Sequence, residues 1–298
     1  MRKIKLGIIT DIHGNIVALE EILKDAEERG VDEYIFLGDL INDFPFQNEV
    51  LEIVKKKSDK VLRGNKEDYL IQYDIDKYMW RELQFRVVRY MYDDLSKENL
   101  EYIRWLPITI AEEYEGVNIR FAHGSPNSVE EFLHQNSRES LDYYTKNLDE
   151  DVLIFGHTHD KMWYETINGK LTINAGCAGV SPYYVAGAEY VILDISGGKI
   201  NDIDLRVVSY DLEKLKQKIE ESGILEVEKT LMNLSFMGIN GHGKERSEFF
   251  KEAKNMMIER SGKWYKKDAN GIFKYFKLFD DDIWISLSKK YSEYFVFK

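Results

Sequence analysis

The chain has 298 residues, of which 44% are hydrophobic and 32% are charged. These proportions exclude a disordered or fibrous chain and fit one large domain, or a domain with an appendage. The net charge is −12, from 41 Lys and Arg against 53 Asp and Glu, and it opposes binding to long nucleic acid or to an anionic membrane, since both require a basic face. We therefore expect local cations, above all metal ions, to hold any phosphate-bearing partner.

Cys177 is the single cysteine, so one chain can form neither a disulfide framework nor a thiolate metal cluster. The basic N-terminus is followed by an apolar run that ends at Thr10, which is shorter than the ~7–15 residues of a signal-peptide core. No stretch of the sequence approaches the ~20 apolar residues of a membrane span. The sequence therefore predicts a cytoplasmic protein without a membrane segment.

Short apolar runs recur along the first half of the chain, and a polar residue follows each of them closely. Runs this short and this rich in β-branched residues are typical of fully buried strands rather than of helices. The predicted strands comprise residues 4–9, 34–37, 61–62, 119–122 and 152–155, which precede Asp11, Asp39, Asn65, His123 and His157 respectively.

Segments with helical spacing lie between the first strands. In residues 16–26 the apolar side chains fall on one face of a helix, and Gly30 is placed to end it. Residues 48–57 predict a second helix with one apolar face. Strands that alternate with helices indicate an α/β layered fold, in which reactive groups collect at the carboxyl ends of the strands.

Beyond about residue 116 the pattern changes toward strands. Residues 171–174 and 188–195 are predicted strands, with turns at 168–169 and 197–198. We expect this second half to form a second sheet that packs on the first.

Residues from about 67 to 106 predict a helical insert with many aromatic side chains. Aromatic residues at helical spacing usually belong to a core, so we expect most of them to lie inside. The alternative is a lid that stacks on a ring of a bound molecule. The aromatic residues of this segment include Tyr69, Tyr73, Trp80, Phe85, Tyr90, Tyr92, Tyr102 and Trp105.

The last 58 residues, 241–298, differ in composition from the rest of the chain. They hold 13 Lys and Arg against 9 Asp and Glu and contain 13 of the 39 aromatic residues, so residues 1–240 carry a net charge of −16. A low proline content and a turn at 270–271 favour an ordered appendage over a disordered tail. We predict a helix over 244–260 and short strands around 264–266, 273–278, 283–287 and 294–297.

Four of the six histidines stand in short polar motifs beside glycine. Asp11 and His13 are separated by one residue, as are His157 and His159. At the end of a strand, such a pair can direct both side chains at one metal ion of borderline hardness. The other two, His134 and His242, are expected to be surface or loop residues.

Each motif alone is weak evidence for a metal site. Asp39 after Gly38 could cap a helix or turn, and Asn65 after Gly64 could occupy a left-handed turn. Five motifs, however, each follow a predicted buried strand, and each brings a ligand suited to the same ions. Their agreement predicts a metal centre.

A resemblance to the calcineurin-like metallophosphoesterase superfamily rests on five motifs, namely Asp11-x-His13, Gly38-Asp39, Gly64-Asn65, His123-Gly124 and Gly156-His157-Thr158-His159. Closer similarities, among them the segments 123–126 and 174–179, resemble the compact bacterial branch related to small phosphodiesterases and diadenosine-tetraphosphate-hydrolase-like proteins. The resemblance covers about residues 1–240. It implies a four-layer αββα sandwich of two mixed β-sheets flanked by helices, to which residues 241–298 add a small α+β appendage of unassigned role.

By this resemblance, seven side chains would hold two divalent metal ions. Asp11, His13, Asp39 and His159 would bind one ion, and Asp39, Asn65, His123 and His157 would bind the other, so that Asp39 bridges them. Two such ions ~3.5–4 Å apart can share a hydroxide, lower its pKa and clamp the phosphoryl oxygens during in-line attack. The metal-bridging hydroxide held at Asp39 is the expected nucleophile. Mn²⁺ is the expected ion, and Fe, Zn²⁺ or Ni²⁺ are alternatives, because mixed nitrogen and oxygen sites discriminate weakly among them.

One position departs from the family pattern. Many members have a histidine after the Gly-Asn pair, which is thought to protonate the leaving oxygen or to steady the phosphate, whereas this chain has Lys66. A lysine cannot replace an imidazole near neutral pH unless its pKa is strongly lowered, so Lys66 is either a solvated residue or a phosphate contact. Without a general acid, anhydrides, aryl esters and activated diesters should be the favoured substrates. Asn15, Asn65 and His123 are further candidate phosphate contacts, and Asn15 can also be the N-cap of the first helix.

The sequence thus predicts a dinuclear metal-dependent phosphoesterase that hydrolyses a phosphodiester, a phosphomonoester or a nucleotide phosphoanhydride. The alternative is a catalytically weak member that acts as a protein-interaction scaffold, as the resemblance to the retromer small subunit allows, although such proteins have usually lost ligands. The expected partner is a small phosphorylated molecule such as a nucleotide, and not long nucleic acid or a membrane. Residues 241–298 are a candidate interface for a partner or for a homo-oligomer.

Overall fold

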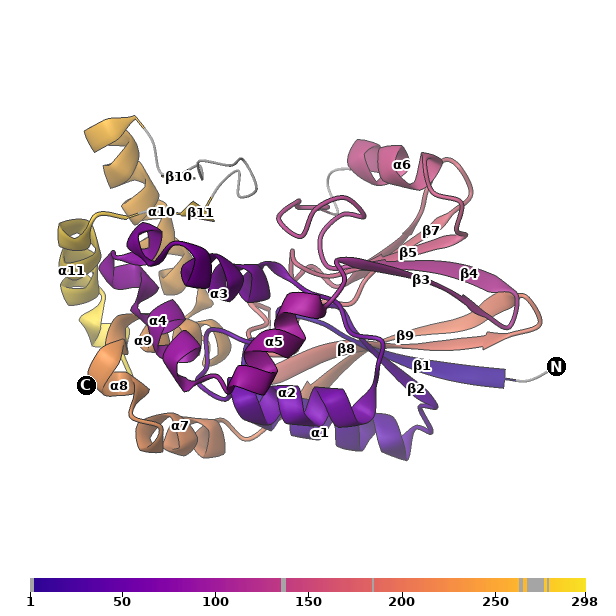
Figure 1. Cartoon of the computed structure of the whole chain (residues 1–298), viewed down its shortest axis with the longest axis horizontal. Coiled ribbons are helices and arrows are strands. Elements are labelled where there is room, and N and C mark those ends of the chain that lie inside the picture. Colours follow the sequence, from indigo (N-terminus) through magenta and orange to yellow (C-terminus); the bar gives the residue numbers. More distant parts are fainter. Residues whose placement is uncertain (1–2, 135–137, 184, 263–264, 267–275, 278) are drawn as a thin grey trace.

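The computed structural model describes residues 3–134, 138–183, 185–262, 265–266, 276–277 and 279–298. Two mixed β-sheets stack face to face, and helices cover their outer faces (Figure 1). This arrangement confirms the predicted αββα sandwich. A group of further helices lies at one end of the two sheets (Figure 1).

The first sheet has the strand order β2-β1-β8-β9, with β1 parallel to β2 and antiparallel to β8. We expected residues 188–195 to belong to the second sheet, and this was wrong. The strand that contains them is buried along most of its length and pairs with β1. Chain order alone does not say which of two stacked sheets a buried strand joins. The strands are β1 (Lys3–Ile9), β2 (Glu33–Phe36), β8 (Gly187–Ser196) and β9 (Lys199–Ser209).

The second sheet has the strand order β3-β4-β5-β7-β6, with β4, β5 and β7 parallel. Residues 61–62 were predicted to be a strand, but within the described residues Val61 forms only an isolated parallel bridge to Phe36. The strands of this sheet are β3 (Thr109–Tyr114), β4 (Val117–Ala122), β5 (Val152–Phe155), β6 (Met162–Glu165) and β7 (Leu171–Asn174).

Apolar side chains from both sheets fill the space between them. The strands alternate their side chains, so every second residue of β1 and β4 enters this layer. Its members include Leu6, Ile8, Ile119, Phe121, Ile154, Ile173 and Leu193.

The outer faces are covered as the sequence predicted. The helices α1 (Ile16–Glu28) and α2 (Gln47–Lys57) belong to the apolar cluster on the first sheet, and α6 (Arg138–Lys146) packs on the second. Asn15 begins α1, because its side-chain oxygen accepts a hydrogen bond from the backbone N–H of Ala18 at 3.1 Å. Gly30 follows the helix with a φ of 70°, as expected of a glycine after a helix end.

The helical insert is present and most of its aromatic residues are inside, as predicted. Tyr73, Trp80 and Phe85 are buried, whereas Trp105 is 84% exposed. The elements of this region are α3 (Asn65–Ile75), the 3-10 helices η1 (Lys77–Trp80) and η2 (Leu83–Phe85), α4 (Arg86–Asp94) and α5 (Lys97–Trp105).

The chain ends in a helical region that packs on the insert. The backbone N–H of Leu83 donates to Asp281 at 2.8 Å, and the backbone N–H of Phe279 donates to Gln84 at 2.8 Å. The elements are α7 (Leu212–Glu221), α8 (Ile224–Val227), α9 (Lys229–Ile239), α10 (Gly243–Ser261), β10 (Tyr265–Lys266), β11 (Phe276–Lys277), α11 (Asp281–Lys290) and the 3-10 helix η3 (Ser292–Tyr294).

The predictions for this last region were only partly right. The helix over 244–260 is confirmed as α10, and β10 and β11 fall within two predicted strands, but 283–287 lies in helix α11. Ile283, Trp284 and Leu287 form the buried face of this helix, and acidic residues at the start of α11 favour the N-terminus of a helix. Residues 294–297 contain the end of η3 and no strand. The predicted turn at 270–271 lies outside the described residues.

The predicted domain boundary at residue 240 stays a prediction. One apolar cluster crosses it, since Leu234 and Met237 of α9 pack with Phe249 of α10 and Trp284 of α11. We therefore treat α9, α10 and α11 together and call them the C-terminal helices.

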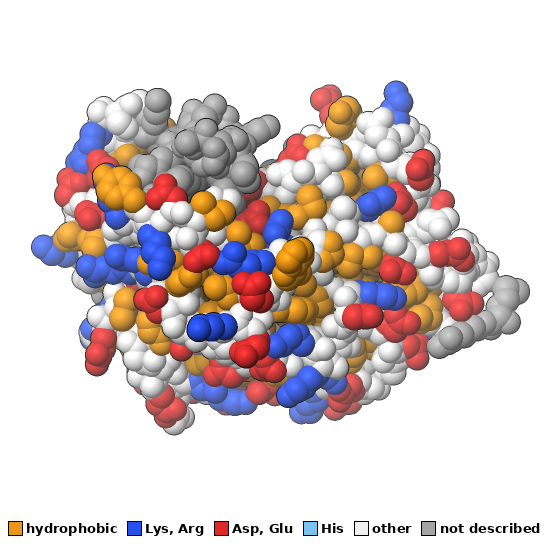
Figure 2. Space-filling view, in the orientation of Figure 1, with side chains coloured by type: hydrophobic (Ala, Val, Ile, Leu, Met, Phe, Trp, Pro, Cys, Tyr) orange, Lys and Arg blue, Asp and Glu red, His pale blue; other side chains and the backbone are white. Residues whose placement is uncertain are grey.

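Basic and acidic side chains are interspersed on the face of the molecule in Figure 2, without a continuous basic stripe. None of the helices in the described parts of the chain has the length and apolar character needed to cross a membrane.

Candidate metal centre

The seven predicted ligands come together at one end of the two sheets. Asp11 and His13 follow β1, Asp39 follows β2, His123 follows β4 and His157 follows β5. Asn65 is the first residue of α3, and His159 lies two residues beyond His157. All except His159 are buried.

The backbone at these positions has an uncommon conformation. Asp11, His13, Asp39, His157 and His159 all have a positive φ, between 49° and 65°. Residues other than glycine adopt this left-handed region rarely and at a cost, and such residues concentrate at functional sites. The loops thus hold the five side chains in place through strained backbone.

Two glycines allow these loops to approach each other closely. A Cβ atom at Gly64 would lie 2.3 Å from the backbone nitrogen of Asp39, and one at Gly156 would lie 2.6 Å from Oδ2 of Asp11. No side chain can be accommodated at either distance. This explains on steric grounds why glycine precedes Asn65 and His157 in the motifs.

The first group of ligand atoms surrounds Oδ1 of Asp11. Nε2 of His159 lies 3.1 Å from this oxygen and 3.2 Å from Nε2 of His13, which is itself 3.6 Å from the same oxygen. The other carboxylate oxygen of Asp11 accepts hydrogen bonds from the Thr10 hydroxyl at 2.7 Å and the His157 backbone N–H at 2.9 Å. Asp11 is therefore fixed so that one oxygen faces the two imidazoles.

The second group surrounds the side-chain oxygen of Asn65. This oxygen lies 3.1 Å from Nε2 of His123, 3.1 Å from Nδ1 of His157 and 3.1 and 3.2 Å from the two carboxylate oxygens of Asp39. All four neighbours carry lone pairs that can face the amide. Rotation of the amide would turn its NH₂ toward them, whereas a bound cation would select the oxygen.

Asp39 lies between the two groups. Its Oδ1 is 3.4 Å from Nε2 of His123, and its Oδ2 is 3.9 Å from Nε2 of His13. Oδ1 also accepts a hydrogen bond from the backbone N–H of Lys66 at 2.8 Å. The two groups are thus the sets that the resemblance implied, and the Asp39 carboxylate lies between them, with Oδ1 beside His123 and Oδ2 on the side of His13.

Outer partners fix two of the imidazoles. Nδ1 of His13 lies 2.8 Å from a carboxylate oxygen of Asp43, and Nδ1 of His123 lies 2.9 Å from the carbonyl oxygen of Leu37. A hydrogen on Nδ1 satisfies these oxygens and leaves the lone pair on Nε2, which faces the ligand groups. Metal-binding histidines commonly have such partners.

The Asp43 carboxylate is held in turn by the C-terminal helices. The hydroxyl of Ser235, in the middle of α9, donates to Oδ1 of Asp43 at 2.7 Å, and both side chains are buried. A chain of contacts therefore runs from α9 through Asp43 to His13.

Glu67 holds the loop that carries Asp39. Its carboxylate accepts hydrogen bonds from the backbone N–H groups of Asp39 at 3.0 Å, Leu40 at 2.8 Å and Gly64 at 2.7 Å. Burial and the nearby Asp39 raise the pKa of Glu67 to about 7, even though these backbone hydrogen bonds favour its ionised form. One fully buried side chain thus joins the loops before α3 and after β2.

The electrostatics of the centre favour a cation. Burial opposes protonation of His13, but Asp43 and Asp11 outweigh this effect and raise the pKa of His13 to about 10. Burial likewise opposes ionisation of Asp11, but His159 and His13 reverse this and lower its pKa well below the usual value. The carboxylates that hold a proton on His13 can stabilise a divalent cation at the same place.

The donor set fits two divalent ions of borderline hardness. The described residues place imidazole and carboxylate ligand atoms within 4.8 Å of one another in the groups Asp11, His13 and Asp39 and Asp39, His123 and His157. In addition, Nε2 of His157 is buried without a hydrogen-bond partner. Mixed nitrogen and oxygen ligands of this kind suit Mn²⁺, Fe, Zn²⁺ or Ni²⁺.

This chain is similar in sequence and in fold to known proteins. Residues 4–198 match the Calcineurin-like phosphoesterase superfamily domain. The chain belongs to the calcineurin-like phosphoesterase superfamily. Its class is therefore that of metal-dependent phosphoesterases, which are hydrolases of phosphoric ester bonds.

Three relatives of this phosphoesterase illustrate the similarity. An uncharacterized protein of Methanocaldococcus jannaschii, MJ0912, is 26% identical, and the match covers 76% of this chain and 96% of that protein. The metallophosphoesterase of Sphaerobacter thermophilus superposes with a TM-score of 0.63 at 22% identity, over 79% of this chain and 99% of that one. The hypothetical protein PH1004 of Pyrococcus horikoshii OT3 superposes with a TM-score of 0.68 at 20% identity, over 80% and 99%. The predicted bacterial branch stays a prediction.

In this phosphoesterase, the side chains of Asn15 and Cys177 form hydrogen bonds inside the protein. The side chain of Asn15 caps α1 and donates to the carbonyl oxygen of Gly179 at 2.8 Å, so both ends of its amide are engaged. We therefore assign Asn15 to the helix cap and not to phosphate binding. Cys177 donates to the carbonyl oxygen of Asp11 at 3.3 Å, and burial raises the pKa of its thiol well above the usual value, which suits a structural role.

A cavity of about 420 Å³ opens onto the ligand groups of this phosphoesterase. Lys66 lines it, and Nζ of Lys66 lies 5.2 Å from the centre of the Tyr69 ring. Lys66 is half-buried on the cavity wall, and the choice between a solvated residue and a phosphate contact stays a prediction. Burial opposes its charge, but Tyr69, Asp43 and Asp39 outweigh this effect and raise the pKa of Lys66, which consequently stays a cation.

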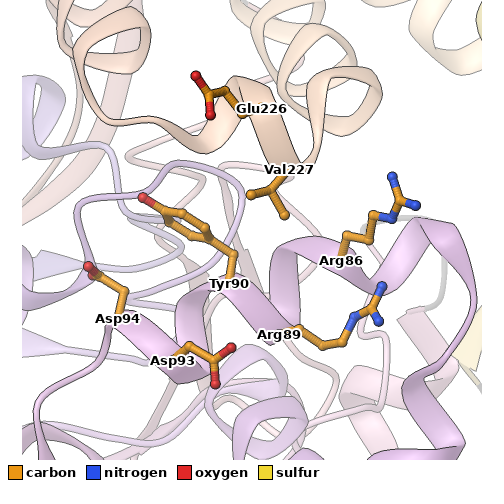
Figure 3. A pocket seen from close by; sticks show the side chains of 7 residues that line it. All are labelled: Arg86, Arg89, Tyr90, Asp93, Asp94, Glu226 and Val227. Carbon is orange, nitrogen blue, oxygen red and sulfur yellow. The ribbon is translucent and has the colours of Figure 1, made fainter.

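Another hollow of this phosphoesterase, of about 590 Å³, lies between α4 and α8 (Figure 3). Arg86 and Arg89 line one side of it, and Asp93 and Asp94 line the other (Figure 3). It contains none of the predicted ligands. Size alone thus does not identify the functional site of this molecule.

Several residues of the site were missed from the sequence. Asp43, Glu67 and Ser235 act through partners far along the chain, and a single sequence does not display such pairs. Glu67 alone had a local signal, because an acidic residue three positions after Gly64 is placed to bond back to the start of the helix. The cavity also contains Glu130 and Arg246, neither of which stands in a motif.

Proposed function

We propose that this protein is a dinuclear metal-dependent phosphoesterase that acts on a small phosphorylated molecule at the Asp39 cluster. The observation that carries the proposal is the position of Asp39, whose two carboxylate oxygens face two separate groups of ligand atoms. Two divalent cations bound there would activate a shared water and polarise the phosphoryl oxygens. Mn²⁺ is the ion that we propose first. The seven intact side chains disfavour a role as a non-catalytic scaffold.

The residues of the cavity wall would bind the rest of the substrate. Lys66 is charged and lines the cavity. It directly follows Asn65, a member of the second group of ligands, in the chain. It is placed to contact an oxygen of the transferred phosphate or of the leaving group. The volume of the cavity, about 420 Å³, is in the range of small-molecule sites and does not fit a long polymer.

A proton for the leaving oxygen would come from the same wall. No histidine follows Asn65, and Glu130 lines the cavity with Oε1 buried and without a hydrogen-bond partner. Burial raises the pKa of Glu130 to about 7, so a part of the molecules carries a carboxylic acid there at neutral pH. We therefore assign Glu130 the role of general acid that imidazole has in many family members.

The test is the hydrolysis of bis-p-nitrophenyl phosphate and p-nitrophenyl phosphate by protein stripped with a chelator, with and without added Mn²⁺. We expect turnover only after the metal is restored, and the preferred ester separates a diesterase from a monoesterase. Equal turnover by the stripped protein, or no turnover of either ester by protein with two bound ions, would contradict the proposal.

A further inference from the structure

The C-terminal helices contribute part of the cavity wall. Leu231 of α9, Arg246 and Phe250 of α10 and Trp284 of α11 line the cavity, together with Phe85 and Val88 of the insert. The four residues lie beyond residues 4–198, the segment that matches the family domain. The cavity is therefore lined both by polar, metal-binding residues and by apolar and aromatic ones.

Arg246 is the cation of this part of the wall. Its side chain is half-buried and its Nε is buried without a hydrogen-bond partner. In the described parts of the chain, no carboxylate forms an ion pair with Arg246, although its charge lowers the pKa of Asp43 after the larger effect of His13. A buried Nε–H that lacks an acceptor costs free energy, and an anionic group in the cavity could supply the acceptor.

The fold holds the Arg246 side chain in one position. Arg246 packs closely on Gly238 of α9, where a Cβ atom would lie 3.3 Å from Cδ and 3.5 Å from Nε of the arginine. The guanidinium lies over the Phe250 ring, 5.4 Å from its centre. A side chain packed in this way loses little additional freedom when it binds an anion.

We propose that Arg246 binds a second anionic group of the substrate, which makes the substrate a phosphate ester or anhydride that carries a further phosphate-like group and an apolar ring. The first phosphate lies at the metal ligands and Lys66, the second at Arg246, and the ring between Phe85, Phe250 and Trp284. This inference rests on the proposed function, since it assumes that one phosphate is held at the Asp39 cluster. It names a residue outside the family domain as the specificity determinant.

Arg89 provides a matched control for Arg246. It is also half-buried on a helix, but it lines the separate hollow between α4 and α8 (Figure 3). Removal of either guanidinium changes the net charge by the same amount. Only the removal of Arg246 should affect a ligand in the metal-binding cavity.

The experiment measures dissociation constants by calorimetry with Mn²⁺-loaded protein. The ligands are the phosphonate analogue of AMP in which a methylene replaces the ester oxygen, called AMP below, the diphosphate analogue α,β-methylene-ADP, and methylenediphosphonate, which lacks the ring. The proteins are the wild type, Arg246→Ala, Arg246→Lys and Arg89→Ala. Thermal unfolding and metal content of each variant show whether it is folded and loaded.

In the wild type and in Arg89→Ala, we expect the diphosphate analogue to bind at least about 10-fold more tightly than AMP. In Arg246→Ala this advantage should fall to about 2-fold or less, and Arg246→Lys should retain a part of it. The compound without the ring should bind more weakly than the diphosphate analogue to all four proteins.

An equal preference in Arg246→Ala and the wild type, or no preference in the wild type, would overturn the assignment of Arg246. Failure of the proposed function has a different signature, namely the absence of Mn²⁺-dependent hydrolysis of any ester by the wild type. Because binding is measured without turnover, the two failures are distinguishable.

Discussion

The loops at the strand ends and the C-terminal helices both line one cavity, but they position their side chains by different means. In the loops, strained backbone and close glycines fix Asp11, Asp39 and His157, and the side chains have little freedom. In the helices, ordinary backbone presents Arg246 and Phe250, and their packing sets their position. The ligand loops have the rigidity that metal binding needs. On the C-terminal helices, side chains can be substituted without a change of the backbone fold.

Because of this difference, we expect the loops to determine the chemistry and the C-terminal helices to determine the choice of substrate. Buried hydrogen bonds tie ligand loops to one another, as those of Glu67 to Asp39 and of the His157 backbone N–H to Asp11 illustrate. The contact between Ser235 and Asp43 is the one described hydrogen bond from α9 to the outer partner of a ligand. Changes in the loops should therefore abolish metal binding and activity, whereas changes in the helices should adjust affinity.

The largest effect is expected for Asp39→Ala. Removal of the carboxylate between the two groups leaves both sets of ligands incomplete, so metal content should fall and activity should drop by far more than the about 10–100-fold that loss of an outer partner costs. Metal analysis and the p-nitrophenyl assays measure both. Asp59→Ala, which removes an exposed carboxylate, should leave metal content and activity unchanged. Retention of full activity and metal in Asp39→Ala would contradict the account.

Glu67→Gln should reduce metal affinity and activity by about 10–100-fold, as expected for an outer partner. A glutamine cannot accept with both side-chain atoms, so its NH₂ group would face either the backbone N–H groups of Asp39 and Gly64 or that of Leu40. Titration of the stripped protein with Mn²⁺ measures the change. The exposed Glu101→Gln is the control, and an unchanged affinity in Glu67→Gln would show that this clamp is dispensable.

Glu130→Gln tests the proposed general acid through the leaving group. We expect a loss of about 10²-fold for an alkyl ester and a much smaller loss for the nitrophenyl ester, because nitrophenolate leaves without a proton. In the wild type, activity on the alkyl ester should fall as the pH rises through about 7, where Glu130 loses its proton. Equal losses on both esters would instead indicate a structural role.

Ser235→Ala should have a smaller effect on the metal centre. The substitution removes the hydrogen bond to Asp43 but leaves Asp43 beside His13, so we expect activity to fall by about 10-fold at most. A higher Mn²⁺ concentration should be needed to reach half-maximal activity. Ser288→Ala, in α11, is the control because its hydroxyl bonds to Thr230 and not to the site. Identical metal titrations of Ser235→Ala and the wild type would remove the proposed link between the helices and the ligands.

The smallest effect is expected at Glu228, which caps α9. Its side chain accepts from the backbone N–H of Leu231 at 2.9 Å, and burial raises its pKa to about 7. Because the pKa in the native state exceeds the ordinary value of 4.5, native Glu228 holds its proton between pH 4.5 and 7, where the unfolded chain has lost it. The stability that this group contributes is therefore complete below pH 4.5 and is lost as the pH rises through 7, by about 3 kcal/mol at most.

Glu228→Gln should flatten this pH dependence while it retains an acceptor for the cap. Urea unfolding at pH 5 and pH 8 measures it, and the variant should be more stable than the wild type at pH 8. The neighbouring Glu226→Gln, an exposed residue, should behave as the wild type. A variant with the same loss of stability between the two pH values would show that Glu228 is not its source.

The sequence was most informative where local pattern and chemistry coincide. Asp11, His123 and His157 each follow a short apolar run, and such a run before a metal-ligand side chain is typical of a buried strand that ends at a site. The segment 283–287 shows the opposite case. Five residues of mixed apolar character fit a strand or a helix equally well, and only the packing of Trp284 against Phe249 distinguishes them.

The contribution of the C-terminal helices to the cavity was not predictable for a related reason. Arg246 packs on Gly238, lies over the Phe250 ring and lines a cavity whose other residues are far along the chain. The pairing of β8 with β1 has the same long-range origin. Such relations depend on how elements pack, which the spacing of residues within one element does not encode.

The central claim is that two ligand groups sharing Asp39 each hold a divalent cation. The most direct measurement is an anomalous difference map from crystals of the protein soaked in Mn²⁺. We predict two peaks, one beside Asp11, His13 and His159 and the other beside Asn65, His123 and His157, with Asp39 between them. A single peak, or peaks away from Asp39, would contradict the account.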